Sequence, residues 1–193
     1  MARAPAQPYL TAADHLDWEQ TQVERHEYID GEVFAMAGAE DAHVTVVVNL
    51  TAALHRHVRG TPCKTYVSDM RLHVAASNAY FYPDVMVTRD GGDPASRLSK
   101  SASVLVVEVL SPSTAHCDTG VKFAHYRHIA SLREYVLIDI DRRSADVYRK
   151  GADGLWVLHP FSDAQAVELA SVDLTLPAAE LFADLEDGGA AAQ

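Results

Sequence analysis

Cysteine is scarce in this sequence, with Cys63 and Cys117 the only two among 193 residues. Two cysteines are too few for a disulfide framework. Long apolar runs are also missing, since no stretch of about 18 apolar residues occurs and no transmembrane helix is expected. The first residues lack the apolar core of a signal peptide. These absences favour a cytoplasmic protein with reduced thiols.

Basic residues are fewer than acidic ones. The chain has 16 Lys and Arg against 27 Asp and Glu, which gives a formal net charge of −11. Nucleic-acid-binding proteins usually carry a basic surface, so this balance counts against that class unless a metal ion or a local basic patch offsets it. Basic residues do cluster within 122–133 and again within 142–150.

Several signatures of familiar enzyme sites are absent as well. Neither a P-loop nor a G-x-G-x-x-G motif occurs, which argues against nucleotide-cofactor chemistry. No G-x-S-x-G motif surrounds Ser111 or Ser113, so these serines are expected in turns and caps. The ten histidines raise the possibility of a zinc site, but no C-x₂-C or H-E-x-x-H spacing supports it.

The composition is that of an ordinary globular domain, with 48% hydrophobic and 22% charged residues. We expect one domain over residues 9–185, with flexible tails at 1–8 and 186–193. Strands and hairpins come first and a strand–helix–strand unit follows. This order predicts an α/β or α+β fold, with helices packed on a sheet.

The periodicity of apolar residues predicts the individual elements. A helix at 43–58 is expected to bury a face made of Val44, Val47, Val48, Thr51, Leu54 and Val58, and to end at Gly60 and Pro62. Pro83 is expected to interrupt the strand at 80–87. The other expected elements are helices at 11–19, 118–130 and 177–185, hairpins at 28–36 and 145–158, strands at 64–67, 71–74, 103–110, 134–140 and 166–169, and a loop at 90–94.

Glu108 is the most informative single residue. It lies within the nearly unbroken apolar run 103–110, on the same face of the expected strand as Val106 and Leu110. A buried carboxylate costs several kcal/mol unless a cation or hydrogen bonds compensate it. Glu108 is therefore paired with a buried Arg or Lys, or bound to a metal.

Asp84 is a similar case, because it follows Pro83 in an aromatic and β-branched strand. Its side chain either caps a turn or points into a cleft. If the strands of Asp84 and Glu108 are neighbours, the two carboxylates can share one cation. Such hard oxygen ligands suit Mg²⁺ or Mn²⁺.

Lys122 falls about four residues into the helix expected after the Glu108 strand. Its long side chain can reach back over the strand end, where an ammonium would stabilise developing negative charge or position a water. Tyr126 follows at i+4 and shares its face. The alternative for Lys122 is a solvated helix lysine.

These residues resemble those of the Uma family of candidate restriction endonucleases, in the PD-(D/E)XK nuclease superfamily. The resemblance covers about residues 9–185, and its most specific part is the run Glu108 to Thr114 followed by a lysine and a tyrosine. The matching features are Pro83-Asp84, Glu108-Val109-Leu110-Ser111-Pro112-Ser113-Thr114, Asp118, Lys122, Tyr126, the segment 134–139, the turn at 28–32 and His43.

The resemblance implies a restriction-endonuclease-like fold, in which helices flank a mixed central sheet. It also implies Asp84 and Glu108 as metal ligands, with Glu32 as a further acidic member of the site. One position departs from the superfamily pattern: the lysine expected two residues after the glutamate is Leu110, and Lys122 in the following helix would replace it.

The resulting hypothesis is Mg²⁺- or Mn²⁺-dependent hydrolysis of a phosphodiester bond in DNA, and the expected form is double-stranded DNA. Asp84 and Glu108 hold the metal, Lys122 and Glu32 complete the catalytic group, and His43 and Tyr126 support it. Cutting both strands favours a homodimer, because two-fold symmetry matches duplex DNA. The alternatives are a binding or assembly module without catalysis and a hydrolase of another phosphodiester such as RNA.

Overall fold

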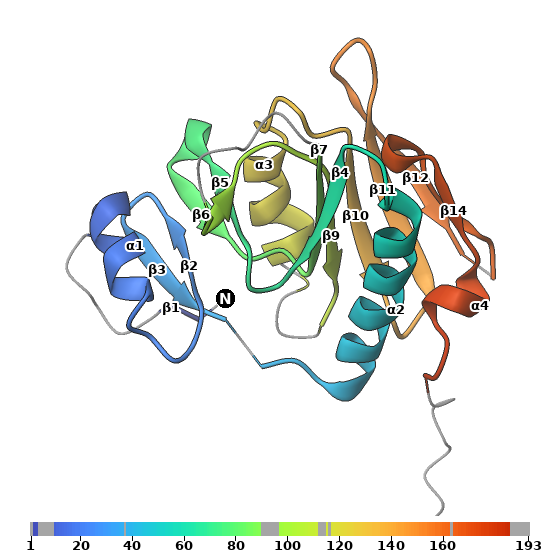
Figure 1. Cartoon of the computed structure of the whole chain (residues 1–193), viewed down its shortest axis with the longest axis horizontal. Helices are drawn as coiled ribbons and strands as arrows, with labels where there is room; N and C mark the ends of the chain where they lie inside the picture. The colour runs from blue at the N-terminus through green and yellow to red at the C-terminus, as the bar shows by residue number, and fades with distance from the viewer. Residues whose placement is uncertain are drawn as a thin grey trace, which may run out of the picture.

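The computed structural model describes residues 2–3, 10–36, 38–89, 97–111, 115, 117–162 and 164–185. Two six-stranded sheets and a small two-stranded sheet form its framework (Figure 1). The first sheet has the order β1 (Ala2–Arg3), β3 (Glu32–Ala35), β2 (His26–Ile29), β6 (Ala79–Phe81), β5 (Arg71–Val74), β8 (Ser99–Lys100). The second sheet has the order β12 (Trp156–Phe161), β11 (Ser144–Lys150), β10 (Glu134–Asp139), β9 (Ser103–Val109), β7 (Val85–Arg89), β4 (Cys63–Val67). The small sheet pairs β13 (Val167–Leu169) with β14 (Leu174–Leu176).

Helices cover the second sheet on both faces. On one face α2 (Asp41–Val58) packs against β4, β7 and β9 and also contacts α4 (Ala178–Leu181). On the other face a short π-helical segment (Cys117–Lys122) leads into α3 (Phe123–Tyr126), and Tyr126 of α3 joins the core between the two sheets. A mixed sheet flanked by helices is the fold that the sequence predicts.

The central strand β9 carries residues of both cores. Leu105, Val107 and Val109 pack with α2, whereas Val106 packs with Tyr126. Because side chains alternate along a strand, Glu108 points to the same face as Val106. β9 pairs with parallel β10 and antiparallel β7, so it is buried from both edges. This confirms the prediction of a central strand at 103–110.

The N-terminal elements follow their local signals. Thr11 caps α1 (Ala12–Glu19): its hydroxyl accepts a hydrogen bond from the Asp14 N–H at 3.2 Å, and its own N–H donates to the Asp14 carboxylate. The β2–β3 hairpin turns at Asp30 and Gly31, with φ values of 42° and 97°. Positive φ at both central residues is the geometry that matches the twist of hairpin strands.

Residues 80–87 do not form the single interrupted strand that the sequence suggested. They split into β6 of the first sheet and β7 of the second, with Tyr82, Pro83 and Asp84 crossing between the sheets. Proline has no N–H to donate to a ladder, so the break falls where the sequence placed it. The consequence is that Asp84 lies at the junction of the two sheets.

The prediction of helix 43–58 is confirmed, but the face assigned to its core was wrong for two of its six residues. Val44 and Val48 are 48% and 58% exposed, whereas Val46, Leu50 and Ala53 are buried together with the expected Leu54 and Val58. Four valines within five positions leave the apolar stripe ambiguous, and the contacts with β4, β7 and β9 decide which row is buried.

Other boundaries also differ from the prediction. The helix expected at 118–130 is the π-helical segment followed by the four-residue α3, and the one expected at 177–185 is α4 alone. The short strands β1, β8 and β14 were not predicted, and β1 falls within the expected N-terminal tail. The expected loop at 90–94, most of the two expected tails, and Pro112 to Thr114 lie outside the described residues. No helix within the described ranges combines the length and apolar character needed to cross a membrane.

Candidate active site

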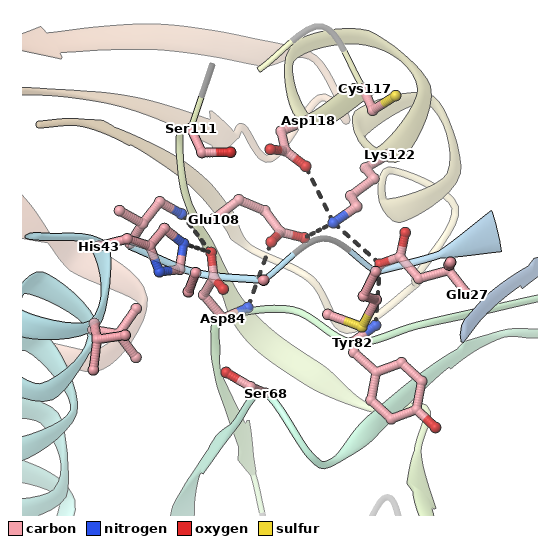
Figure 2. Close-up of a pocket in the computed structure, with 17 residues that line it drawn as sticks. Glu27, His43, Ser68, Tyr82, Asp84, Glu108, Ser111, Cys117, Asp118 and Lys122 are labelled. Carbon is pink, nitrogen blue, oxygen red and sulfur yellow. Dashed lines mark hydrogen bonds and ion pairs between the residues drawn. The ribbon is translucent and has the colours of Figure 1, made fainter. Parts of the chain in front are cut away.

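Asp84 and Glu108 lie side by side where β7 begins and β9 ends. In the antiparallel register Val85 pairs with Val107, and the next step of that register sets Asp84 opposite Glu108. The Val109 N–H donates to Asp84 Oδ2 at 2.8 Å, and the Asp84 N–H points at Glu108 Oε2 at 3.5 Å. The structure thus brings the two predicted carboxylates together on one side of the sheet (Figure 2).

Lys122 reaches Glu108 from the π-helical segment. Its Nζ lies 3.2 Å from Glu108 Oε1, 3.1 Å from Glu27 Oε1 and 3.1 Å from Asp118 Oδ1 (Figure 2). The lysine is only 6% exposed, so it is not the solvated helix residue of the alternative interpretation. Asp118 and Lys122 are four residues apart in this π-helical segment and both are buried, and π-helical turns are frequent at functional sites.

Tyr126 contacts the same oxygen of Glu108. Its hydroxyl, fully buried, donates to Glu108 Oε1 at 2.8 Å. Glu108 Oε1 is therefore bound by a tyrosine and an ammonium, whereas Oε2 faces Asp84. The sequence prediction that Lys122 and Tyr126 share one helical face agrees with this arrangement.

The electrostatics of the cluster are dominated by burial. Burial raises the pKa of Glu108 well above its ordinary value; Lys122 opposes that shift, and Asp118 and Asp84 add to it. Burial also raises the pKa of Glu27. For Lys122 burial acts to lower the pKa, but the carboxylates of Glu108, Glu27 and Asp118 raise it well above the ordinary value. One ammonium thus lies close to three carboxyl groups, and burial favours the neutral form of two of them, Glu108 and Glu27.

His43 holds the other carboxylate. It is the third residue of α2, and its Nε2 lies 3.3 Å from Asp84 Oδ2. The hydrogen bond to Asp84 raises the pKa of His43, against the effect of burial. Together with the Val109 N–H, His43 fixes the orientation of Asp84 Oδ2.

Glu27, and not Glu32, is the acidic residue of the β2–β3 hairpin that reaches this cluster. Glu27 is 2% exposed, contacts Lys122 and accepts a hydrogen bond from the Tyr82 N–H at 3.3 Å. Glu32 is exposed at the first position of β3, beside the turn, and does not line the cavity. Glu27 is flanked by His26 and Tyr28 and not by an apolar run like that around Glu108, so the sequence alone did not distinguish it from Glu32.

A second layer of hydrogen bonds supports this side of the site. The Tyr82 hydroxyl donates to Glu19 Oε1 at 3.1 Å, and Glu19 also accepts the His26 N–H at 2.9 Å. Glu19 is 2% exposed at the end of α1. These hydrogen bonds connect helix α1 to the strand that carries Glu27. The sequence analysis singled out neither Glu19 nor Tyr82.

The cluster opens into a cavity of about 680 Å³. One side is polar and includes the four carboxylates, Lys122 and His43, as Figure 2 shows. We call the second side of the cavity, or its apolar side, the lining from the end of β3 and Met36, from Gly38 and Ala39, and from the first two turns of α2 apart from His43. The residues that line this second side are Ala35, Met36, Gly38, Ala39, Val44 and Val47.

The donor set fits a hard divalent cation. Among the described residues no three His, Cys, Asp or Glu side chains form a closed metal-binding group, and a zinc site usually needs at least three such protein ligands. Mg²⁺ is more often held by one or two carboxylates, and water and substrate phosphate complete its shell. Asp84 and Glu108 provide that number of carboxylates, and both line the cavity.

Comparison with known proteins gives a consistent result. A family model described as "Putative restriction endonuclease", Uma2, matches residues 12–184. Two uncharacterized proteins of Synechocystis sp. are 36% identical over 177 residues (91% of this chain and 93% of the relative) and 39% identical over 153 residues (77% and 85%).

A similar fold is found in a crystal structure of a putative nuclease of Anabaena variabilis that belongs to DUF820. The two structures have a TM-score of 0.76 at 18% sequence identity, over 90% of this chain and 97% of the other. At this identity the likeness concerns the fold. The family match covers the elements that carry Glu27, His43, Asp84, Glu108 and Lys122, and the chain therefore belongs to the Uma2 family of putative restriction endonucleases.

Proposed function

We propose that the protein is a metal-dependent endonuclease that hydrolyses phosphodiester bonds of DNA. The observation that carries the proposal is the pair of carboxylates, Asp84 and Glu108, set opposite each other beside a cavity. Membership of the Uma2 family supports it independently. Asp84 and Glu108 would hold Mg²⁺ or Mn²⁺, and when bound such a cation neutralises phosphate charge and lowers the pKa of water.

The residues around the pair hold it in place. The Val109 N–H and His43 orient Asp84, and Tyr126 and Lys122 orient Glu108. Preorganised ligands of this kind lose little conformational entropy when substrate binds. Removal of residues that orient metal ligands typically lowers metal affinity or activity by about 10- to 100-fold.

Lys122 has two roles in this proposal. It neutralises Glu108 within the cluster, and because it also lines the cavity it stabilises negative charge that develops on the phosphate. Glu27 and Asp118 hold the ammonium in this position. We assign to Glu27 the supporting acidic role that the sequence resemblance gave to Glu32.

For double-stranded DNA, cleavage of both strands requires two such sites. A two-fold homodimer supplies them in the symmetry of the duplex. Light scattering of the purified protein at several concentrations, with and without duplex DNA, tests this part of the proposal. A monomer in both conditions would restrict the enzyme to one strand at each encounter.

The test of the function is cleavage of a nucleic-acid panel in Mg²⁺ or Mn²⁺. The panel contains supercoiled plasmid, linear duplex, single-stranded DNA and RNA of the same sequence. Asp84→Asn and Glu108→Gln should each abolish most cleavage, whereas Asp17→Asn, an exposed acid on α1, should leave it unchanged. Circular dichroism confirms that each variant is folded.

The outcomes separate the alternatives. Metal-dependent cleavage of DNA that both site variants abolish supports the proposal. Cleavage of RNA alone would replace DNA by RNA as the substrate. DNA binding without cleavage in either metal would indicate a module without catalysis, and unchanged cleavage by Asp84→Asn would refute the mechanism.

A further inference from the structure

The apolar side of the cavity has no role in holding a metal or a phosphate. Its six lining residues, Ala35, Met36, Gly38, Ala39, Val44 and Val47, carry no charged group. Phosphate oxygens and hydrated cations are not stabilised by aliphatic side chains. This side is therefore expected to contact a less polar part of the substrate.

The valines of α2 show that this apolar surface is open. Val44 is 48% exposed although it lines the cavity, and Val47 is half-buried. Exposed apolar surface beside polar groups is typical of ligand sites. The cavity volume of about 680 Å³ falls within the usual range of roughly 300–1,000 Å³ for sites that enclose a small molecule, a size class that includes a nucleoside.

The cavity offers little positive charge to a phosphate. Lys122 is the only Lys or Arg among the described residues that line the cavity, and its ammonium already lies within 3.2 Å of three carboxylates. The whole chain has a net charge of −11. The protein's own side chains therefore attract a phosphate only weakly inside the cavity, and we expect another part of the nucleotide to supply binding energy there.

We propose that the apolar side of the cavity binds the base of the nucleotide at the cleaved phosphate, and that this base is unpaired. The inference rests on the proposed nuclease function and narrows its substrate to DNA with an unpaired nucleotide. A paired base is stacked inside the duplex, and turning it out costs a few kcal/mol. A bulge or a single strand avoids most of this cost.

The first test measures binding without cleavage. Fluorescence anisotropy, with Ca²⁺ replacing Mg²⁺, compares three DNAs of the same sequence: a fully paired duplex, the duplex with a one-nucleotide bulge, and the single strand. Because a few kcal/mol separate paired from unpaired bases, we expect the bulge and the single strand to bind at least about tenfold more tightly than the paired duplex. Equal affinity for the three DNAs would overturn the inference.

The second test uses two valines of the same helix. Val44→Ser should weaken binding of the bulged duplex by about three- to tenfold, in line with loss of one partly covered apolar side chain, and leave the paired duplex unaffected. Val48→Ser is the matched control, because Val48 is 58% exposed on α2 but does not line the cavity. Equal effects of both substitutions would also overturn the inference.

The combined results separate this inference from the nuclease proposal. Preference for unpaired DNA without hydrolysis in Mg²⁺ or Mn²⁺ would support the base site and refute the nuclease. Cleavage of DNA without any preference for unpaired nucleotides would support the nuclease proposal and refute the base site. Binding of the single strand but not of the bulge would support the inference and identify a free strand as the source of the base.

Discussion

Tyr126 and Glu108 are joined by a buried hydrogen bond: the hydroxyl donates to Glu108 Oε1 over 2.8 Å, and the two residues are 0% and 2% exposed. Lys122, one helical turn before Tyr126, lies 3.2 Å from the same oxygen. A single short helical segment thus satisfies one oxygen of the buried carboxylate from two directions. The other oxygen remains on the side of Asp84.

Removal of the Tyr126 hydroxyl should destabilise the protein. In Tyr126→Phe the ring packing is kept, but a hydrogen bond to a buried charged group is lost, which costs about 1–3 kcal/mol. Urea unfolding measures this change. Tyr148→Phe is the control, since Tyr148 belongs to the same aromatic group around Phe123 and should cost less than about 0.5 kcal/mol. A Tyr126→Phe protein as stable as the native one would contradict the prediction.

Lys122 and Glu108 should show strong coupling in a double-mutant cycle. Lys122→Met leaves buried carboxylates without their ammonium, so the free energy of unfolding should fall by about 3–5 kcal/mol. Addition of Glu108→Gln removes one of those charges and should recover part of the loss. Lys64→Met, at an exposed lysine, should change stability by less than about 0.5 kcal/mol. Additive effects of the Lys122 and Glu108 substitutions would mean that the pair contributes no net interaction.

The sequence predicted the parts of the fold that local patterns determine. The run 103–110 is apolar at almost every position, so it could only be a strand buried on both faces, and Glu108 stood out against it. Pro83 marked the break between β6 and β7. Thr11 with Asp14, and Asp30 with Gly31, marked a helix start and a hairpin turn. In each case the residues that decide the structure are close in the sequence.

The rest depends on contacts between distant segments. Glu27 reaches Lys122 because the first sheet packs beside the second, and no local pattern indicates which glutamate of the hairpin faces that junction. The buried row of α2 depends on its contacts with β4, β7 and β9. The sequence carries no local pattern that distinguishes the π-helical segment Cys117–Lys122 from a regular α-helix.

His43 should control metal use without direct contact with the phosphate. In His43→Gln, Asp84 loses a partner that orients its carboxylate, so the Mn²⁺ concentration for half-maximal cleavage should rise by about 10- to 100-fold. The rate at saturating Mn²⁺ should fall less than that. His55→Gln is the matched control, an exposed histidine of the same helix. An equal loss of rate at all Mn²⁺ concentrations would argue instead for a direct catalytic role of His43.

His15 should make the protein less stable in mild acid. It is fully buried, its ring stacks on Tyr28 with a centroid separation of 4.9 Å, and neither ring nitrogen has a hydrogen-bond partner among the described residues. Burial, with smaller contributions from the charges of Arg71 and His26, lowers the pKa of His15 from 6.5 to about 4. The ring is therefore neutral in the folded protein at pH values where an unfolded chain is protonated.

The sign of the effect follows from this difference in pKa. The contribution of the neutral His15 ring to the free energy of unfolding is fully present above pH 6.5 and is lost as the pH falls toward about 4. This contribution is on the order of 3 kcal/mol. His15→Phe keeps a stacked ring but cannot take up a proton. Between about pH 7 and pH 4, the free energy of unfolding should therefore fall less in His15→Phe than in the native protein. His128→Gln, at an exposed histidine, should follow the native curve, and parallel curves for His15→Phe and the native protein would show that His15 does not cause the acid sensitivity.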